Sequence, residues 1–189
     1  MNINIDKDIK NIISLVNKSK FIKAKNLTEK IIKFSPTKDI LFNILGVIEL
    51  KLNNFHSAIK YFKKSLKLNK KFFSAQLNLA ITYKKIDMFK ESIESYLETI
   101  NLKPNSCELY NDIALLYKKI KNYDKAITYL NKIIVINSKY EKAYFNLGLI
   151  YINLNNLDKA EYNFIKCIEI TNNFYEAFFQ LAEIKRKKQ

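Results

Sequence analysis

The sequence predicts an all-α protein, built as a solenoid of antiparallel helix pairs. The first observation is a period. The only two glycines, Gly46 and Gly148, lie three times 34 residues apart, and the only two prolines, Pro36 and Pro104, lie twice 34 apart. The second is the scarcity of these residues, because a sheet protein of 189 residues needs many tight turns. The third is the helical spacing of the apolar residues, which at 48% of the chain are enough for a real core.

The period divides the chain into repeats. Tyrosines recur every 34 positions in one place of the repeat, and small residues recur in another. These residues are Tyr83, Tyr117 and Tyr151, and Ala58, Ser92, Ala126 and Ala160. We therefore expect one array over residues 1–189. It consists of a divergent unit at 5–38, regular units at 39–72, 73–106, 107–140 and 141–174, and a capping helix at 175–189.

Each unit is expected to contain two helices. In unit 39–72, Phe42 and Leu45 belong to the apolar side of the first helix. A polar joint of two asparagines follows at 53–54, and asparagine suits it because this residue tolerates left-handed backbone. The second helix carries Phe62. In the preceding unit the second helix should end near Pro36, because a proline blocks its continuation.

Small residues mark the place where the two helices of a unit should cross. Helices approach closely where side chains are small, and larger residues such as Leu45 and Phe62 then fill the space beside the crossing. One position is occupied by a small residue in the first helix of each regular unit and in the capping helix. These residues are Gly46, Ala80, Ala114, Gly148 and Ala182. Leucine in place of Gly148 is therefore expected to overpack the crossing.

These features resemble the tetratricopeptide-repeat family from about Ile5 to Arg186. The family's pattern is a large aromatic residue, Leu-Gly and Tyr in the first helix, then Ala, an aromatic residue, Ala and Pro in the second. The resemblance implies a right-handed superhelix whose concave groove is lined by the first helices. The large aromatic place is taken by Phe42, Tyr110, Tyr144 and Phe178.

The chain also departs from the family pattern in several places. Gln76 replaces the large aromatic residue in unit 73–106, and Glu49 stands where tyrosine is usual. The first unit departs most, because Asp8, Asn11 and Ile12 occupy its aromatic and Leu-Gly places. Terminal repeats are often atypical, so this unit is interpreted as a cap.

The resemblance implies a peptide-binding groove on the first helices. In superhelical members of the family, a row of asparagines holds an extended peptide by its backbone. An asparagine suits this task because it offers both donors and an acceptor to one peptide unit. An alternative is that asparagine is simply common here and the groove uses other residues. The candidate groove residues are Asn43, Asn78, Asn111, Asp112, Phe145, Asn146 and Gln180.

Lysines near the ends of two first helices are expected to give the groove a basic rim. They are Lys84, Lys85, Lys118 and Lys119. The family's two-carboxylate clamp, which grips acidic chaperone tails, is not expected. Asn43 and Val47 stand where the clamp needs Lys and Asn, and Glu108 and Asp112 stand where it needs cations.

The function predicted from these observations is that of a scaffold or adaptor that binds a partner protein or peptide segment. The alternative is an acidic partner or nucleic acid bound through the lysine-rich surface, because the formal net charge is +15. Arg186 is the only arginine, whereas nucleic-acid surfaces usually use arginine for bidentate contacts. Coding bias in an A+T-rich genome also explains abundant Lys, Asn and Ile.

An enzyme is not expected, and no catalytic residue, cofactor, metal or small-molecule substrate is predicted. His56 is the only histidine and has no triad or metal-ligand spacing around it. The only cysteines, Cys107 and Cys167, are too far apart for a metal-binding pair and are interpreted as reduced packing residues. The sequence shows no membrane span or secretory signal, so a cytoplasmic protein is the expectation.

Overall fold

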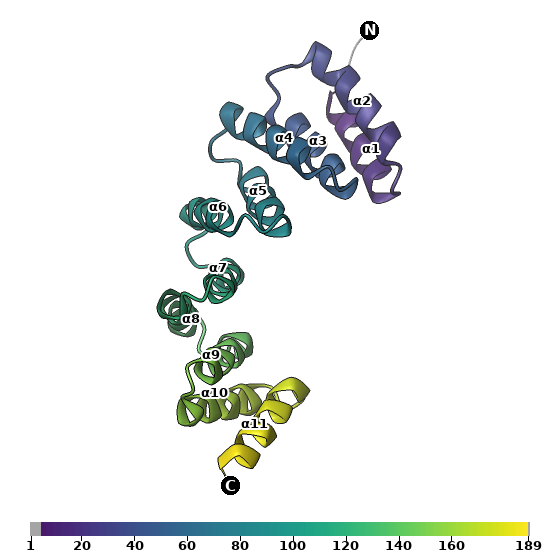
Figure 1. Ribbon diagram of the computed structural model, residues 1–189. Coiled ribbons are helices and arrows are strands. Elements are labelled where there is room, and N and C mark those ends of the chain that lie inside the picture. Colours follow the sequence, from purple (N-terminus) through teal and green to yellow (C-terminus); the bar gives the residue numbers. More distant parts are fainter. Residues whose placement is uncertain (1–4, 189) are drawn as a thin grey trace. The chain divides into compact units, whose positions relative to one another are not determined.

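The computed structural model describes residues 5–188, and this range contains eleven helices and no strand (Figure 1). The predicted all-α fold is confirmed. The helices are α1 (Ile5–Asn17), α2 (Phe21–Phe34), α3 (Asp39–Lys51), α4 (Phe55–Leu68), α5 (Phe73–Lys85), α6 (Phe89–Leu102), α7 (Cys107–Lys119), α8 (Tyr123–Ile136), α9 (Glu141–Asn153), α10 (Leu157–Ile170) and α11 (Tyr175–Lys188).

The chain divides into two compact units, Met1–Leu102 with α1–α6 and Lys103–Gln189 with α7–α11. Within each unit, neighbouring helices in the sequence pack as pairs (Figure 1). The odd-numbered helices are the first helices of the repeats, and the even-numbered ones are the second helices. A first helix of 13 residues is paired with a second helix of 14 residues throughout α1–α10. One array over the whole chain stays a prediction.

The same turn joins the first helix of each repeat to the second. Asn53 has a φ of 60°, and the N–H of Asn54 donates to the carbonyl of Glu49 at 2.9 Å. A left-handed residue followed by this long return bond satisfies the last carbonyls of a helix. The same left-handed backbone recurs every 34 residues, at Ser19, Asn53, Asp87, Lys121 and Asn155.

Asparagines in the joint also start second helices. The side-chain oxygen of Asn122 accepts from the N–H of Lys125 at 3.2 Å, and that of Asn156 accepts from the N–H of Lys159 at 3.1 Å. This bond satisfies one of the free N–H groups at a helix start. The predicted polar joint therefore has two roles, because it ends one helix and begins the next.

The two helices of a repeat cross where a glycine faces an aromatic ring. A Cβ atom on Gly148 would lie 2.6 Å from Cε1 of Phe164, and one on Gly46 would meet Phe62 in the same way. Both rings are fully buried. The sequence interpretation placed large residues beside the crossing, whereas the structure places the ring directly on the glycine.

The last helix, α11, covers the end of the second compact unit. Ala177 and Ile184 are buried in the core that also contains Phe164 and Cys167. Near its end, the ammonium of Lys188 pairs with Asp158 of α10 at 2.7 Å. Within residues 5–188, none of the helices combines the length and the apolar character needed to cross a membrane.

Candidate functional site

Two candidate groove asparagines bond to each other between neighbouring first helices. The Nδ2 of Asn78 on α5 donates to the Oδ1 of Asn43 on α3 at 3.1 Å. Asn43 retains 9% of its surface, whereas Asn78 is half-buried. This Asn43–Asn78 pair lies wholly within the unit Met1–Leu102.

A second pair of the same design lies in the unit Lys103–Gln189. The Nδ2 of Asn146 on α9 donates to the Oδ1 of Asn111 on α7 at 2.8 Å. In this pair the donor is the more buried residue, because Asn146 is 8% exposed and Asn111 is half-buried. Each compact unit therefore carries one asparagine pair that joins two consecutive first helices.

Each pair keeps unused hydrogen-bonding capacity. An asparagine side chain has two N–H donors and one carbonyl acceptor. The bond uses one N–H of Asn78 and the oxygen of Asn43, so it leaves the oxygen of Asn78 and the NH2 group of Asn43 outside it. The pair as a whole can thus still both donate and accept, and Asn78 is its more accessible member.

The other candidate groove residues lie in different surroundings. The ring of Phe145 packs 4.8 Å from that of Phe174 and 5.7 Å from that of Phe164, measured between centroids, as part of the core around α9–α11. Asp112 is half-buried on α7, beside Asn111 in the sequence. Gln180 is half-buried on α11. The structure thus joins four of the seven candidates in pairs and places Phe145 in a packing role.

The candidate rim lysines form two sets, one in each compact unit. Lys84 and Lys85 end α5, where Lys84 Nζ lies 5.7 Å from the ring centroid of Tyr96 and Lys85 is exposed. Lys118 and Lys119 end α7, where burial lowers the pKa of Lys118 and Lys119 is exposed. Lysines at helix C-termini are favoured by the helix dipole.

A buried carboxylate explains why Glu49 occupies a place where tyrosine is usual. Its side chain is 2% exposed and accepts from Lys25 of α2 at 2.7 Å and from Asn54 at 2.8 Å. Burial raises the pKa of Glu49, but the hydrogen bonds from Lys25 and Asn54 outweigh it and hold this pKa below its usual value. The ion pair ties the divergent first repeat to the second, which the sequence did not indicate.

The cysteines and the histidine show no catalytic arrangement. Cys107 and Cys167 are buried free thiols, and burial raises the pKa of Cys167 to about 11. Such thiols are poor nucleophiles, because the thiolate is the reactive form. His56 is exposed in the first turn of α4. Within residues 5–188, no three His, Cys, Asp or Glu residues are placed to hold a metal ion.

Comparison with known proteins identifies the repeat. The family model described as "Tetratricopeptide repeat" matches residues 41–72, 73–106, 108–140 and 141–174. No curated protein sequence matches the chain. The matched ranges include both asparagine pairs.

Several solved structures share the fold. A crystal structure of MamA is 24% identical over 86% of this chain and 95% of its own, with a TM-score of 0.77. YrrB, whose structure is described as "a TPR protein with an unusual peptide-binding site", is 16% identical over 91% and 89%, with a TM-score of 0.77. A tetratricopeptide repeat protein from Parabacteroides merdae is 19% identical over 95% and 71%, with a TM-score of 0.83.

Proposed function

Because the chain belongs to the tetratricopeptide-repeat family, we propose that it is a protein-interaction scaffold that binds an extended peptide segment along its first helices. The observation that carries this proposal is the pairing of Asn43 with Asn78 and of Asn111 with Asn146. Polar side chains that are linked in pairs across consecutive first helices provide fixed donors and acceptors on the side of the repeats that the family uses for partners.

The pairing prepares the asparagines to bind a peptide backbone. A peptide unit presents one N–H and one C=O, and the oxygen of Asn78 that the mutual bond leaves unused can accept from such an N–H. Because the side chains are already held, less rotamer freedom is lost on binding. Each backbone bond contributes about 0.5–1.5 kcal/mol, so each pair makes a modest contribution that depends little on peptide sequence.

The more accessible asparagine of each pair is the expected contact. Asn78 and Asn111 are half-buried, whereas Asn43 and Asn146 keep less than a tenth of their surface. Asn43 and Asn146 therefore position their partners. The description of YrrB as a peptide-binding protein of the same fold supports a peptide as the ligand.

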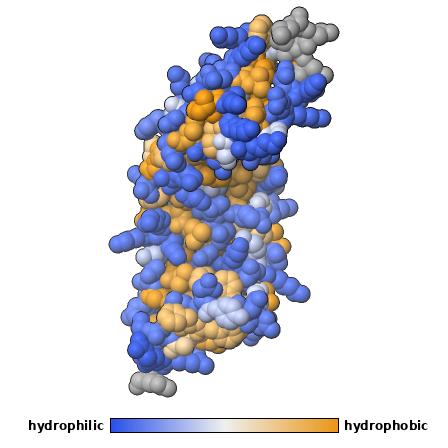
Figure 2. All heavy atoms as spheres, turned by 90° about the vertical axis from the view of Figure 1, so that its right-hand side faces the viewer, coloured by the Kyte–Doolittle hydropathy of each residue, from blue (hydrophilic) through white to orange (hydrophobic). Residues whose placement is uncertain are grey.

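The alternative function, binding of an acidic partner or nucleic acid, is favoured by the net charge of +15 and by exposed lysines such as Lys85 and Lys119. Hydrophilic side chains are spread over the face shown in Figure 2, with hydrophobic ones between them. Binding through lysines to phosphates would weaken steeply as salt is added. Binding through neutral amides would not.

A selection from a random peptide library, followed by titration at two salt concentrations, separates the two functions. The proposal expects a selected peptide whose affinity falls at least ~fivefold in Asn78→Ala/Asn111→Ala and changes little in the matched control Lys85→Ala/Lys119→Ala. If the lysine variant loses affinity instead of the asparagine variant, and the affinity falls steeply in high salt, the charge-based function replaces the peptide scaffold.

A further inference from the structure

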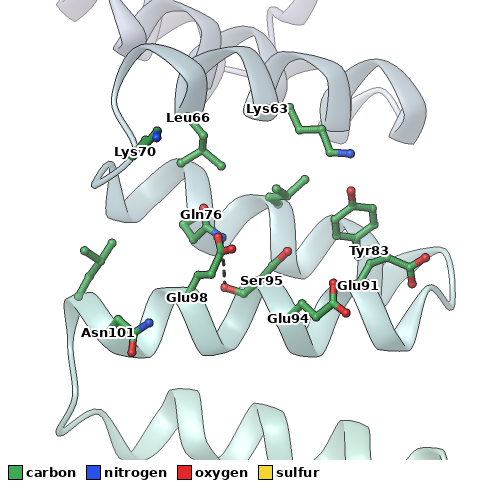
Figure 3. Close-up of a pocket in the computed structure, with 12 residues that line it drawn as sticks. Lys63, Leu66, Lys70, Gln76, Tyr83, Glu91, Glu94, Ser95, Glu98 and Asn101 are labelled. Carbon is green, nitrogen blue, oxygen red and sulfur yellow. Dashed lines mark hydrogen bonds between the residues drawn. The ribbon is translucent and has the colours of Figure 1, made fainter.

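A pocket of about 650 Å³ lies within the unit Met1–Leu102, between α4, α5 and α6 (Figure 3). Leu66, Leu79 and Tyr83 contribute its apolar surface. Its wall from α6 carries three carboxylates, those of Glu91, Glu94 and Glu98. The pocket involves two second helices, so it is a different surface from the Asn43–Asn78 pair and goes beyond the proposed function.

Gln76 lines the pocket at a position where other repeats carry an aromatic residue. At the equivalent position of the preceding repeat, Phe42 is a large side chain that is 1% exposed. Gln76 is 4% exposed, and its amide donates to the carboxylate of Glu98 and to the carbonyl of Ser95 (Figure 3). The shorter side chain therefore turns toward α6, and it fixes one of the three carboxylates at the pocket.

The chain contains its own comparison site, because the cleft between α8, α9 and α10 lies at the same repeat positions 68 residues later. Its volume is about 400 Å³. There Tyr144 stands in place of Gln76, Lys159 in place of Glu91, and Tyr162 in place of Glu94. Both clefts lie between two second helices, whereas the larger volume and the three carboxylates are found only in the first of the two.

The charge of the pocket is opposite to that of the chain. The three glutamates are spaced three and four residues apart, so they share one face of α6. None of them is in a salt bridge within the part of the chain that the structure describes. On the opposite wall, Lys63 and Lys70 are exposed, and Lys63 Nζ lies 5.8 Å from the ring centroid of Tyr83.

We propose that this pocket binds an arginine side chain of a partner protein. The aliphatic stem would lie on Leu66 and Leu79, and the planar guanidinium offers five N–H donors to the several carboxylate oxygens of α6. The lysines of the opposite wall can donate to the backbone carbonyls that flank the arginine, which favours a peptide over a simple cation.

Nuclear magnetic resonance titration with N-acetyl-arginine amide tests the site, with N-acetyl-citrulline amide as its uncharged isostere. The proposal expects saturable shifts at Gln76 and along α6 for the arginine compound, and at least ~tenfold weaker binding of the citrulline compound. Equal shifts with both compounds, or no saturable shift at Gln76 and α6, would overturn it.

Two variants use the chain's own residues to remove the site. Gln76→Tyr restores the ring found at Tyr144, and Glu91→Lys/Glu94→Tyr copies the second cleft. Both should abolish the shifts while thermal melts show a folded protein, because the second cleft already accommodates these residues. As a matched control, Lys159→Ala in the second cleft should leave arginine binding unchanged. Binding that survives Gln76→Tyr, or that is lost in Lys159→Ala, contradicts the assignment.

Discussion

The amide of Asn78 donates to the side-chain oxygen of Asn43 across 3.1 Å, and so links the first helices of two successive repeats. The acceptor is the more buried of the two. Because an unsatisfied buried polar atom costs more than an exposed one, the two residues are not equivalent in their effect on stability.

We expect Asn78→Ala to destabilise the protein by about 1–3 kcal/mol, because it leaves the buried oxygen of Asn43 without its donor. Asn43→Ala should cost only about 0.5–1.5 kcal/mol, because water can replace the partner of half-buried Asn78. Urea unfolding of both variants and of the double variant measures these costs. The bond does not form in solution if the two single variants lose equal free energies of unfolding and the double variant loses their sum, without any coupling energy.

Gly148→Ala tests the contact between the glycine and the ring of Phe164. Alanine normally stabilises a helix relative to glycine, but here its Cβ would lie 2.6 Å from the ring, so a loss of about 1–3 kcal/mol is expected. The double variant Gly148→Ala/Phe164→Leu copies Ala114 and Leu130 of an earlier repeat, both of which are buried. It should recover part of the loss in thermal melts, whereas a stabilised single variant would contradict the packing.

The ion pair of Glu49 with Lys25 predicts a dependence of stability on acid. The pKa of Glu49 is lowered in the folded protein, so its contribution is present above the unfolded value and disappears as pH falls through the folded value. We expect Glu49→Gln to cost about 1–3 kcal/mol at pH 7, with a difference from wild type that shrinks below its ordinary pKa of 4.5. A difference in melting temperature between wild type and Glu49→Gln that stays constant from pH 7 to pH 3 would argue against this role.

The two thiols should differ in reactivity. Cys167 is fully buried with a pKa raised to about 11, whereas Cys107 keeps 8% of its surface. We expect a disulfide reagent at pH 8 to modify native Cys107 slowly and Cys167 more slowly still, and to modify both at once after unfolding. Mass spectrometry of partly labelled protein identifies the order, and labelling of Cys167 first would be inconsistent with the core around α10 and α11.

The helices and their pairing could be predicted because the 34-residue period repeats in several kinds of residue at once. The turn was only partly predictable. Asn53 and Asn155 indicate left-handed backbone, but Asp87 and Lys121 adopt the same φ of 59° although lysine has no such preference. The packing of the helix pair imposes this turn, and a sequence pattern does not record that packing.

The candidate site shows a similar limit. The asparagines could be identified as groove candidates, but their pairing joins the fifth position of one repeat to the sixth of the next, a relation that a strict 34-residue alignment does not reveal. Phe145 stands at a groove position but packs on Phe174. A pattern of positions cannot show this, because the covering ring comes from the connection before α11.

The measurement that tests the central proposal most directly compares a selected peptide with copies that carry N-methyl groups on internal amides. Methylation removes backbone N–H donors and leaves the side chains unchanged. If the unused oxygen of Asn78 accepts from the peptide backbone, methylation weakens binding by about tenfold in wild type and has much less effect in Asn78→Ala. Equal affinity of the wild-type protein for methylated and unmethylated peptides would contradict backbone binding by the asparagines.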